Sequence, residues 1–196
     1  MRALALALLL GGCSRPLPSL GEVPSFALID QAGRATGRNE LVGKVWVANF
    51  IFTRCPTICP TFTAKMADLQ RRAVAAETPL RLVSFSVDPE YDTPERLHAY
   101  GAGFDADSST WSFLTGEMTA VREVVMDGFK MSMGRDNDDP SSIFHGTYFV
   151  LVDAETRIRG YYAVEEEAAL ARLLNDAARL AELAPSSPQL AKEMKP

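Results

Sequence analysis

The residues with the clearest chemical potential are two cysteines, Cys55 and Cys59, in the stretch FIFTRCPTICPTF. They lie four positions apart, and in a helical turn this spacing brings both side chains to one side of the chain. Their Cα atoms would then be about 6 Å apart, which suits a disulfide and equally two thiolates that bind one metal ion. The stretch therefore allows a structural disulfide, a redox pair or part of a metal site.

A structural disulfide here would close a very short loop, so it would constrain little of the unfolded chain. A helix that begins beside the cysteines is expected to lower the pKa of the thiols and to favour the thiolate, which is both nucleophile and metal ligand. Two thiolates suit copper(I), zinc or iron–sulfur chemistry, whereas a structural zinc site needs four ligands. A metal site at this pair therefore needs at least one further ligand.

The chain has two histidines, His98 and His145, as candidates for that ligand. His98 lies in ERLHAYG, within a predicted helix, and is expected to be a solvated surface residue. His145 lies between a polar loop and the apolar stretch TYFVLVD. That position allows it to approach the cysteine turn, although an ordinary loop or edge histidine is the alternative.

The N-terminal stretch MRALALALLLGGCSRP predicts a targeting segment. Its apolar run is far shorter than the roughly 20 residues that span a bilayer, which is typical of a signal peptide. Leu10-Gly11-Gly12-Cys13 resembles a bacterial lipobox, in which Cys13 carries the lipid; a small-residue turn after a short buried helix is the alternative. We expect a signal peptide at 1–12, an anchor and tether at 13–22, a domain at 23–184 and a flexible tail at 185–196.

The expected location is the extracytoplasmic face of a bacterial membrane, on the periplasmic side where there are two membranes. Disulfides can form and persist in that compartment. The 196 residues carry a net charge of −5 without a basic stripe, which argues against nucleic acid as a partner. At 47% hydrophobic residues the composition is that of a globular domain.

Strands and helices are predicted to alternate along this domain. Apolar runs predict strands at 25–30, 45–52, 80–87, 111–116, 147–153 and 157–164. Helical spacing and capping residues predict helices at 60–76, 94–101, 118–129 and 165–183. This order indicates an α/β fold with a mixed central sheet flanked by helices, in a thioredoxin-like arrangement. The cysteines would lie at a strand-to-helix crossover, where such sheets usually place their sites.

Three pieces of the sequence together resemble the SCO/SenC family: CPTICP, SFSVDPEYDTPERL, and a histidine before an apolar strand. The resemblance covers about residues 21–183. It implies a membrane-tethered, thioredoxin-like copper protein that helps to assemble the binuclear copper centre of cytochrome c oxidase. Carried over, the ligands of one copper, as Cu(I) or Cu(II), are Cys55, Cys59 and His145. The implied partners are the copper-site subunit of cytochrome c oxidase and a copper donor protein.

Two aspartates fall on the family's acidic motif. Asp88 follows a predicted strand end, so it could support the site as a hydrogen-bond acceptor or help to dock a partner; turn formation is the alternative. For Asp92 a capping or turn role is favoured. The family often has Asp before its histidine and a hydroxyl residue after it, whereas this chain has Phe144 and Gly146.

The leading hypothesis is therefore a copper metallochaperone. The alternative is a thiol-disulfide oxidoreductase in which Cys55 and Cys59 are catalytic and keep the copper-site cysteines of a client reduced. The spacing of the pair is one residue longer than the common redox motif, and no proline directly precedes TYFVLVD. A cysteine peroxidase would need a hydroxyl three residues before its cysteine, where this chain has Phe52 and Pro56. The alternation of Met131 and Met133 suggests a strand with both side chains on one side, and they are expected to be core or pocket wall rather than ligands.

Overall fold

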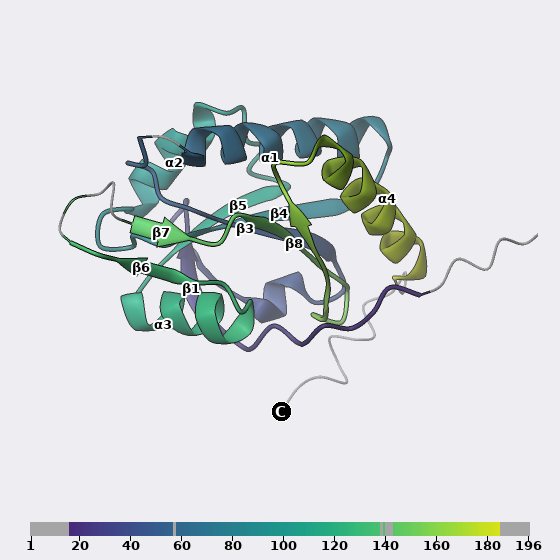
Figure 1. Ribbon diagram of the computed structural model, residues 1–196, viewed down its shortest axis with the longest axis horizontal. Helices are drawn as coiled ribbons and strands as arrows, with labels where there is room; N and C mark the ends of the chain where they lie inside the picture. The colour runs from purple at the N-terminus through teal and green to yellow at the C-terminus, as the bar shows by residue number, and fades with distance from the viewer. Residues whose placement is uncertain (1–15, 57, 138, 140–142, 185–196) are drawn as a thin grey trace, which may run out of the picture.

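The computed structural model describes residues 16–56, 58–137, 139 and 143–184. Its centre is a seven-stranded sheet with helices on both faces (Figure 1), which confirms the predicted α/β class with a mixed sheet. The predicted signal peptide, Cys13 and the tail from residue 185 lie outside the described residues. Within the described ranges, no helix combines the length and the apolar character that crossing a bilayer requires.

The strand order in the sheet is β2-β1-β5-β4-β3-β8-β9. Three parallel strands form its centre: β3 (Val45–Ile51), β4 (Leu80–Ser86) and β5 (Trp111–Thr115). Four antiparallel strands flank them: β1 (Ala27–Asp30), β2 (Ala35–Gly37), β8 (Tyr148–Val152) and β9 (Ile158–Ala163). Every residue of β3 is buried, as its continuous apolar run predicted.

One face of the sheet is covered by three helices: α1 (Ile58–Ala75), α2 (Pro94–Ala102) and α4 (Glu167–Leu183). The helix α3 (Met118–Arg122) and the π-helical turn η2 (Glu123–Gly128) cover the other face, and a short 3-10 turn, η1 (Arg38–Leu41), precedes β3. Each face has its own apolar core. The sequence predicted the main helices, with α1 beginning at Ile58 rather than Pro60.

The helix predicted at 118–129 is not one continuous α-helix. It changes to a π-helical turn at Glu123, where the N–H of Phe129 donates to the carbonyl of Val124 at 3.0 Å. The wider turn ends at Phe129, whose ring packs edge-on against Trp46 and Phe50. Packing of this aromatic group, rather than helical propensity, accounts for the difference.

A second sheet of two short strands lies outside the main one: β6 (Met133–Arg135) and β7 (Ile143–His145). The alternation of the two methionines predicted a strand around them, but no pattern predicted a strand at 143–145. Met131 and Met133 are 7% and 5% exposed and pack in the same core as the two cysteines. They are therefore buried, as expected.

Candidate metal and redox site

Three segments that are distant in the sequence meet at one edge of the main sheet. β3 leads into the loop of Cys55, and its parallel neighbour β4 leads into the turn of Asp88. β8 is antiparallel to β3, so its start lies at the same edge, and β7 with His145 comes just before it. The topology thus brings together the cysteines, the aspartate and the histidine that the sequence singled out.

Cys55 and Cys59 lie on the two sides of the start of α1, and both are present as thiols. The backbone N–H of Cys59 donates to the sulfur of Cys55 at 3.4 Å, so the side chain of Cys55 folds back over the first turn of the helix. Cys59 is completely buried, whereas Cys55 keeps 8% of its surface exposed. The start of α1 therefore brings the two cysteines together, with Cys59 inside the helix and Cys55 before it.

The prediction that the helix start lowers the thiol pKa is wrong for Cys59. Burial raises the pKa of the Cys59 thiol, because a thiolate would lose its hydration inside the core. A hydrogen bond at the backbone of Phe52 opposes this shift, and the neighbouring Cys55 adds to it. Cys59 is thus a protonated thiol at neutral pH rather than an activated nucleophile.

His145 reaches the buried cysteine across the site. Its Nε2 lies 3.3 Å from the Sγ of Cys59, and its Nδ1 lies 3.0 Å from the carbonyl oxygen of Gly146. Because a carbonyl can only accept, Nδ1 carries the hydrogen and Nε2 of the neutral ring is the unprotonated nitrogen. Burial lowers the pKa of His145, and the hydrogen bond to Gly146 opposes this only in part. His145 is therefore a neutral imidazole whose lone pair faces a thiol.

The other histidine has no part in this arrangement. His98 lies on the exposed side of α2, as predicted. The ring of Phe52, by contrast, packs edge-on against the ring of His145 with 5.9 Å between the centroids. A pocket of about 220 Å³ opens beside Cys55 and His145. The site is thus a small, mostly apolar hollow with sulfur and nitrogen donors at its wall.

Among the described residues, no three His, Cys, Asp or Glu side chains are already arranged to hold a metal ion. Two thiols and one imidazole are nevertheless the soft donors that suit copper. In the present arrangement the sulfur of Cys55 accepts the N–H of Cys59. The donor set therefore fits copper, which Cys55, Cys59 and His145 would hold.

Asp92 holds the beginning of the cysteine loop. Its buried carboxyl accepts hydrogen bonds from the N–H of Thr53 at 3.1 Å, from the Thr53 hydroxyl at 2.5 Å and from the Ser86 hydroxyl at 2.6 Å. Burial raises the pKa of Asp92, and these hydrogen bonds offset only part of the shift. The cap of α2 is instead Thr93, which accepts from the N–H of Arg96 at 3.4 Å, with Pro94 at the first helical position.

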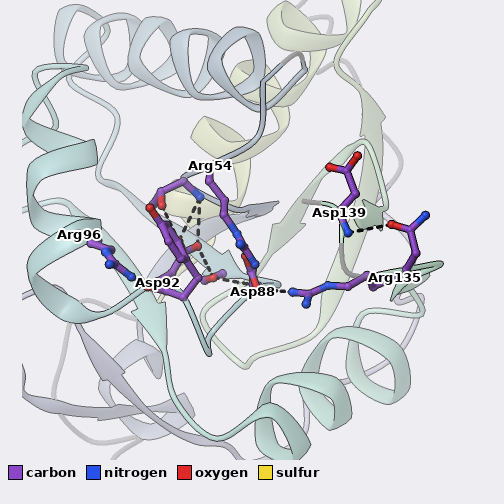
Figure 2. Close-up of polar contacts among 10 residues, drawn as sticks. Arg54, Asp88, Asp92, Arg96, Arg135 and Asp139 are labelled. Atoms are coloured by element: carbon purple, nitrogen blue, oxygen red, sulfur yellow. Dashed lines mark hydrogen bonds and ion pairs between the residues drawn. The ribbon is translucent and has the colours of Figure 1, made fainter. Parts of the chain in front are cut away.

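Asp88 is completely buried and meets two arginines (Figure 2). Arg54 Nε donates to its Oδ2 and Arg135 donates to its Oδ1, both at 2.6 Å. The sequence predicted that Asp88 lies on the rim of the cysteines, but it did not indicate these partners. Arg54 directly precedes Cys55 and could have been suspected, whereas no pattern linked Arg135 to a residue 47 positions away.

The two departures from the family pattern have structural partners. Gly134 pairs with Phe144 across the two-stranded sheet, and a Cβ at Gly134 would overlap the ring of Phe144. A Cβ at Gly146 would overlap the sulfur of Met131. Each unusual residue beside His145 is thus matched to a neighbour: Phe144 covers a glycine, and Gly146 makes room for a methionine.

The model of the SCO1/SenC family matches residues 18–182. The chain belongs to the SCO1/SenC family. The SCO1 protein homolog of Bacillus subtilis is 36% identical over 146 residues, which is 74% of this chain and 75% of that protein. The resemblance seen in the sequence is therefore confirmed over residues 18–182.

Solved structures of the family share the fold. A SCO1/SenC family lipoprotein from Bacillus anthracis superposes with a TM-score of 0.80 at 34% identity, covering 85% of this chain and 99% of that one. BsSco, described as a cytochrome c oxidase assembly protein with a disulfide switch, gives 0.73 at 32% identity, covering 85% and 99%. Copper-bound ScoI of Bradyrhizobium japonicum gives 0.67 at 25% identity, covering 79% and 98%. The predicted thioredoxin-like fold is confirmed.

Proposed function

We propose that this chain binds one copper ion through Cys55, Cys59 and His145 and delivers it during maturation of the binuclear copper centre of cytochrome c oxidase. The observation that carries the proposal is the approach of His145 Nε2 to Cys59 Sγ at 3.3 Å, across 86 positions of sequence. The unprotonated Nε2 is the atom that can bind a metal. Family membership and the copper-bound structure of a relative support copper as the metal.

Delivery requires that copper be exchanged rather than locked in. Cys55 is the partly exposed member of the pair and borders the pocket, so an incoming thiolate of a partner could reach copper from its side. The partners that fit this role are the copper-site subunit of the oxidase and a copper donor protein. Lipid attachment at Cys13 would hold the chain on the extracytoplasmic face of the membrane, and a relative in the family is a lipoprotein.

Copper stoichiometry and affinity of the reduced protein test this proposal. Wild type is expected to bind one copper per chain, whereas His145→Ala should weaken binding sharply and Cys55→Ala/Cys59→Ala should abolish it. His98→Ala is the matched control, because it removes the exposed histidine and should bind copper like wild type. Full copper binding by the double cysteine variant would refute the site.

A second function, thiol-disulfide exchange, is favoured by one observation. The cysteines lie close enough for the N–H of one to contact the sulfur of the other, and a relative is described as having a disulfide switch. The burial and raised pKa of the Cys59 thiol make it a slow nucleophile, so Cys55 would have to attack first. Exchange activity that survives in His145→Ala, together with weak copper binding in wild type, would favour this function over copper delivery.

A further inference from the structure

The buried carboxylate of Asp88 contacts the cysteine loop and the histidine strands at once, through Arg54 and Arg135. Its side chain has 0% exposure, while those of Arg54 and Arg135 are 27% and 29% exposed. Burying an unpaired carboxylate costs several kcal/mol, so the two arginines are needed to keep it where it is. Figure 2 shows the guanidinium groups approaching Asp88 from different directions, each on its own carboxylate oxygen.

Each arginine belongs to a segment that carries a candidate ligand. Arg54 directly precedes Cys55 in the loop after β3. Arg135 is the last residue of β6 and pairs with Ile143 of β7, in the register that also pairs Met133 with His145. Asp88 itself follows β4 and is tied back to it by a hydrogen bond from its N–H to Ser86 Oγ at 3.1 Å. The carboxylate thus joins the cysteine loop, the central sheet and the histidine strands.

The two-stranded sheet that contains His145 depends on contacts outside itself for its position. β6 and β7 have three residues each, and their two-stranded sheet is separate from the main one. An isolated two-stranded ribbon of this size is marginally stable by itself. Met133 and Ile143 pack against the core, and the ring of His145 packs edge-on against Phe52. The Arg135–Asp88 pair adds a charged contact to these apolar ones, so its removal leaves the position of His145 less determined.

We propose that Asp88 is a positioning residue: through Arg54 and Arg135 it fixes the approach of His145 to Cys55 and Cys59. This deepens the proposed function, since it assumes these three residues act together. Asp88 does not touch the metal in this role. Its carboxylate supplies two acceptors for two cationic donors, and neither a neutral amide nor a single arginine can reproduce that link.

Asp88→Asn is the direct test, because it keeps the size of the side chain and removes one acceptor. The amide NH₂ would face a guanidinium, donor against donor, so one arginine is released into solvent. The matched control is Asp153→Asn: Asp153 is also buried, and it is held by Arg157 at 3.0 Å and Arg159 at 2.6 Å. Asp153 follows the far end of β8, away from His145.

Amide hydrogen exchange of the reduced, metal-free, full-length protein is measured first. In Asp88→Asn we expect at least about tenfold faster exchange at 133–135 and 143–147, with the central strand β3 unchanged. Asp153→Asn should leave exchange at these residues as in wild type. Equal exchange of these residues in wild type and Asp88→Asn would overturn the proposal.

Substitution of each arginine tests one of the two ion pairs of Asp88 separately. Arg135→Gln should speed exchange in β6 and β7 only, while Arg54→Gln should speed it in residues 53–55 only. The rate of copper release is then compared, with an expected acceleration of about 10-fold to 100-fold in Asp88→Asn and none in Asp153→Asn. Because exchange is measured without metal, failure of wild type to bind copper would refute the proposed function and leave the positioning role standing.

Discussion

Cys59 is the residue whose chemistry depends most on its burial. Its thiol pKa is raised by burial, so the group keeps its proton at neutral pH. Copper must displace that proton to bind the sulfur, and copper affinity should therefore rise with pH across about pH 6 to 8. Competition with a Cu(I) chelator at several pH values measures how copper affinity changes with pH. Calorimetry in buffers of different ionisation enthalpy counts the released protons. An affinity that does not change with pH would contradict the assignment of Cys59 as a thiolate ligand.

Gly146, the residue after His145, has little space for a side chain because Met131 lies against it. Restoring a hydroxyl there, as Gly146→Ser, should lower the free energy of unfolding by about 1–3 kcal/mol, because the new side chain overlaps Met131. Urea unfolding measures the loss. The double variant Gly146→Ser/Met131→Ala should be more stable than the sum of the two single changes predicts, with a coupling of about 0.5–3 kcal/mol. Strict additivity would mean that the two positions do not compete for space.

At the scale of elements, two buried aspartates fix loops to strands with opposite pH dependence. Burial raises the pKa of Asp92, which ties the cysteine loop to the end of β4. Burial also acts to raise the pKa of Asp153, but hydrogen bonds from Arg157 and Arg159 outweigh it and hold the pKa below its usual value. The folded state therefore favours the proton on Asp92 and disfavours it on Asp153.

The pH dependence of stability distinguishes the two. The contribution of Asp92 is fully present below its unfolded pKa of about 3.9 and is lost as the pH rises through the higher folded value. Asp92→Asn should therefore cost more stability at about pH 3 than at pH 7. The contribution of Asp153 is present above about pH 3.9 and is lost as the pH falls, so Asp153→Asn should cost more at pH 7. Urea unfolding of both variants at the two pH values measures these losses of stability. If both variants lost more stability at the same pH, the opposite pKa shifts of Asp92 and Asp153 would be refuted.

Several helices and strands could be predicted from the sequence alone, and others could not. The buried run of β3, the Thr93-Pro94 start of α2 and the hairpin of β8 and β9 are local patterns, and the structure has them all. The two-stranded sheet of β6 and β7 was not predicted in full, because three-residue strands carry too few residues to show a period. Its position depends on the contact of Arg135 with Asp88, which joins residues far apart in the chain.

The same limit applies to the site. Residue types and order indicated Cys55, Cys59 and His145, because the chain offers few other soft donors. The raised pKa of Cys59 could not be predicted, since a helix start and complete burial act in opposite directions and only the packing decides between them. The hydrogen bonds of Asp92 could not be predicted either. One partner, Thr53, follows β3, and the other, Ser86, is the last residue of β4.

At the scale of the whole molecule, the start of the described chain and the candidate site lie at opposite ends of the sheet. Leu20 and Gly21 form backbone hydrogen bonds with Ile158 at 2.8 Å, and the N–H of Val23 donates to Thr156 at 2.9 Å. This anchoring is at the turn between β8 and β9, whereas His145 precedes the other end of β8. Five strand residues separate these ends by about 17 Å.

If lipid attached to Cys13 holds the chain on a membrane, this geometry points the candidate site away from the bilayer. Full-length, lipidated protein in nanodiscs that contain spin-labelled lipid tests the orientation by nuclear magnetic resonance. Relaxation enhancement should be strong at Ala154 and Glu155, beside the docked N-terminal segment, and weak at Ile58 and Phe144, beside the site. Cys13→Ser should abolish the enhancement at both ends. Stronger enhancement at Phe144 than at Glu155 would mean that the site faces the membrane, and a partner would then have to approach along the bilayer surface rather than from above it.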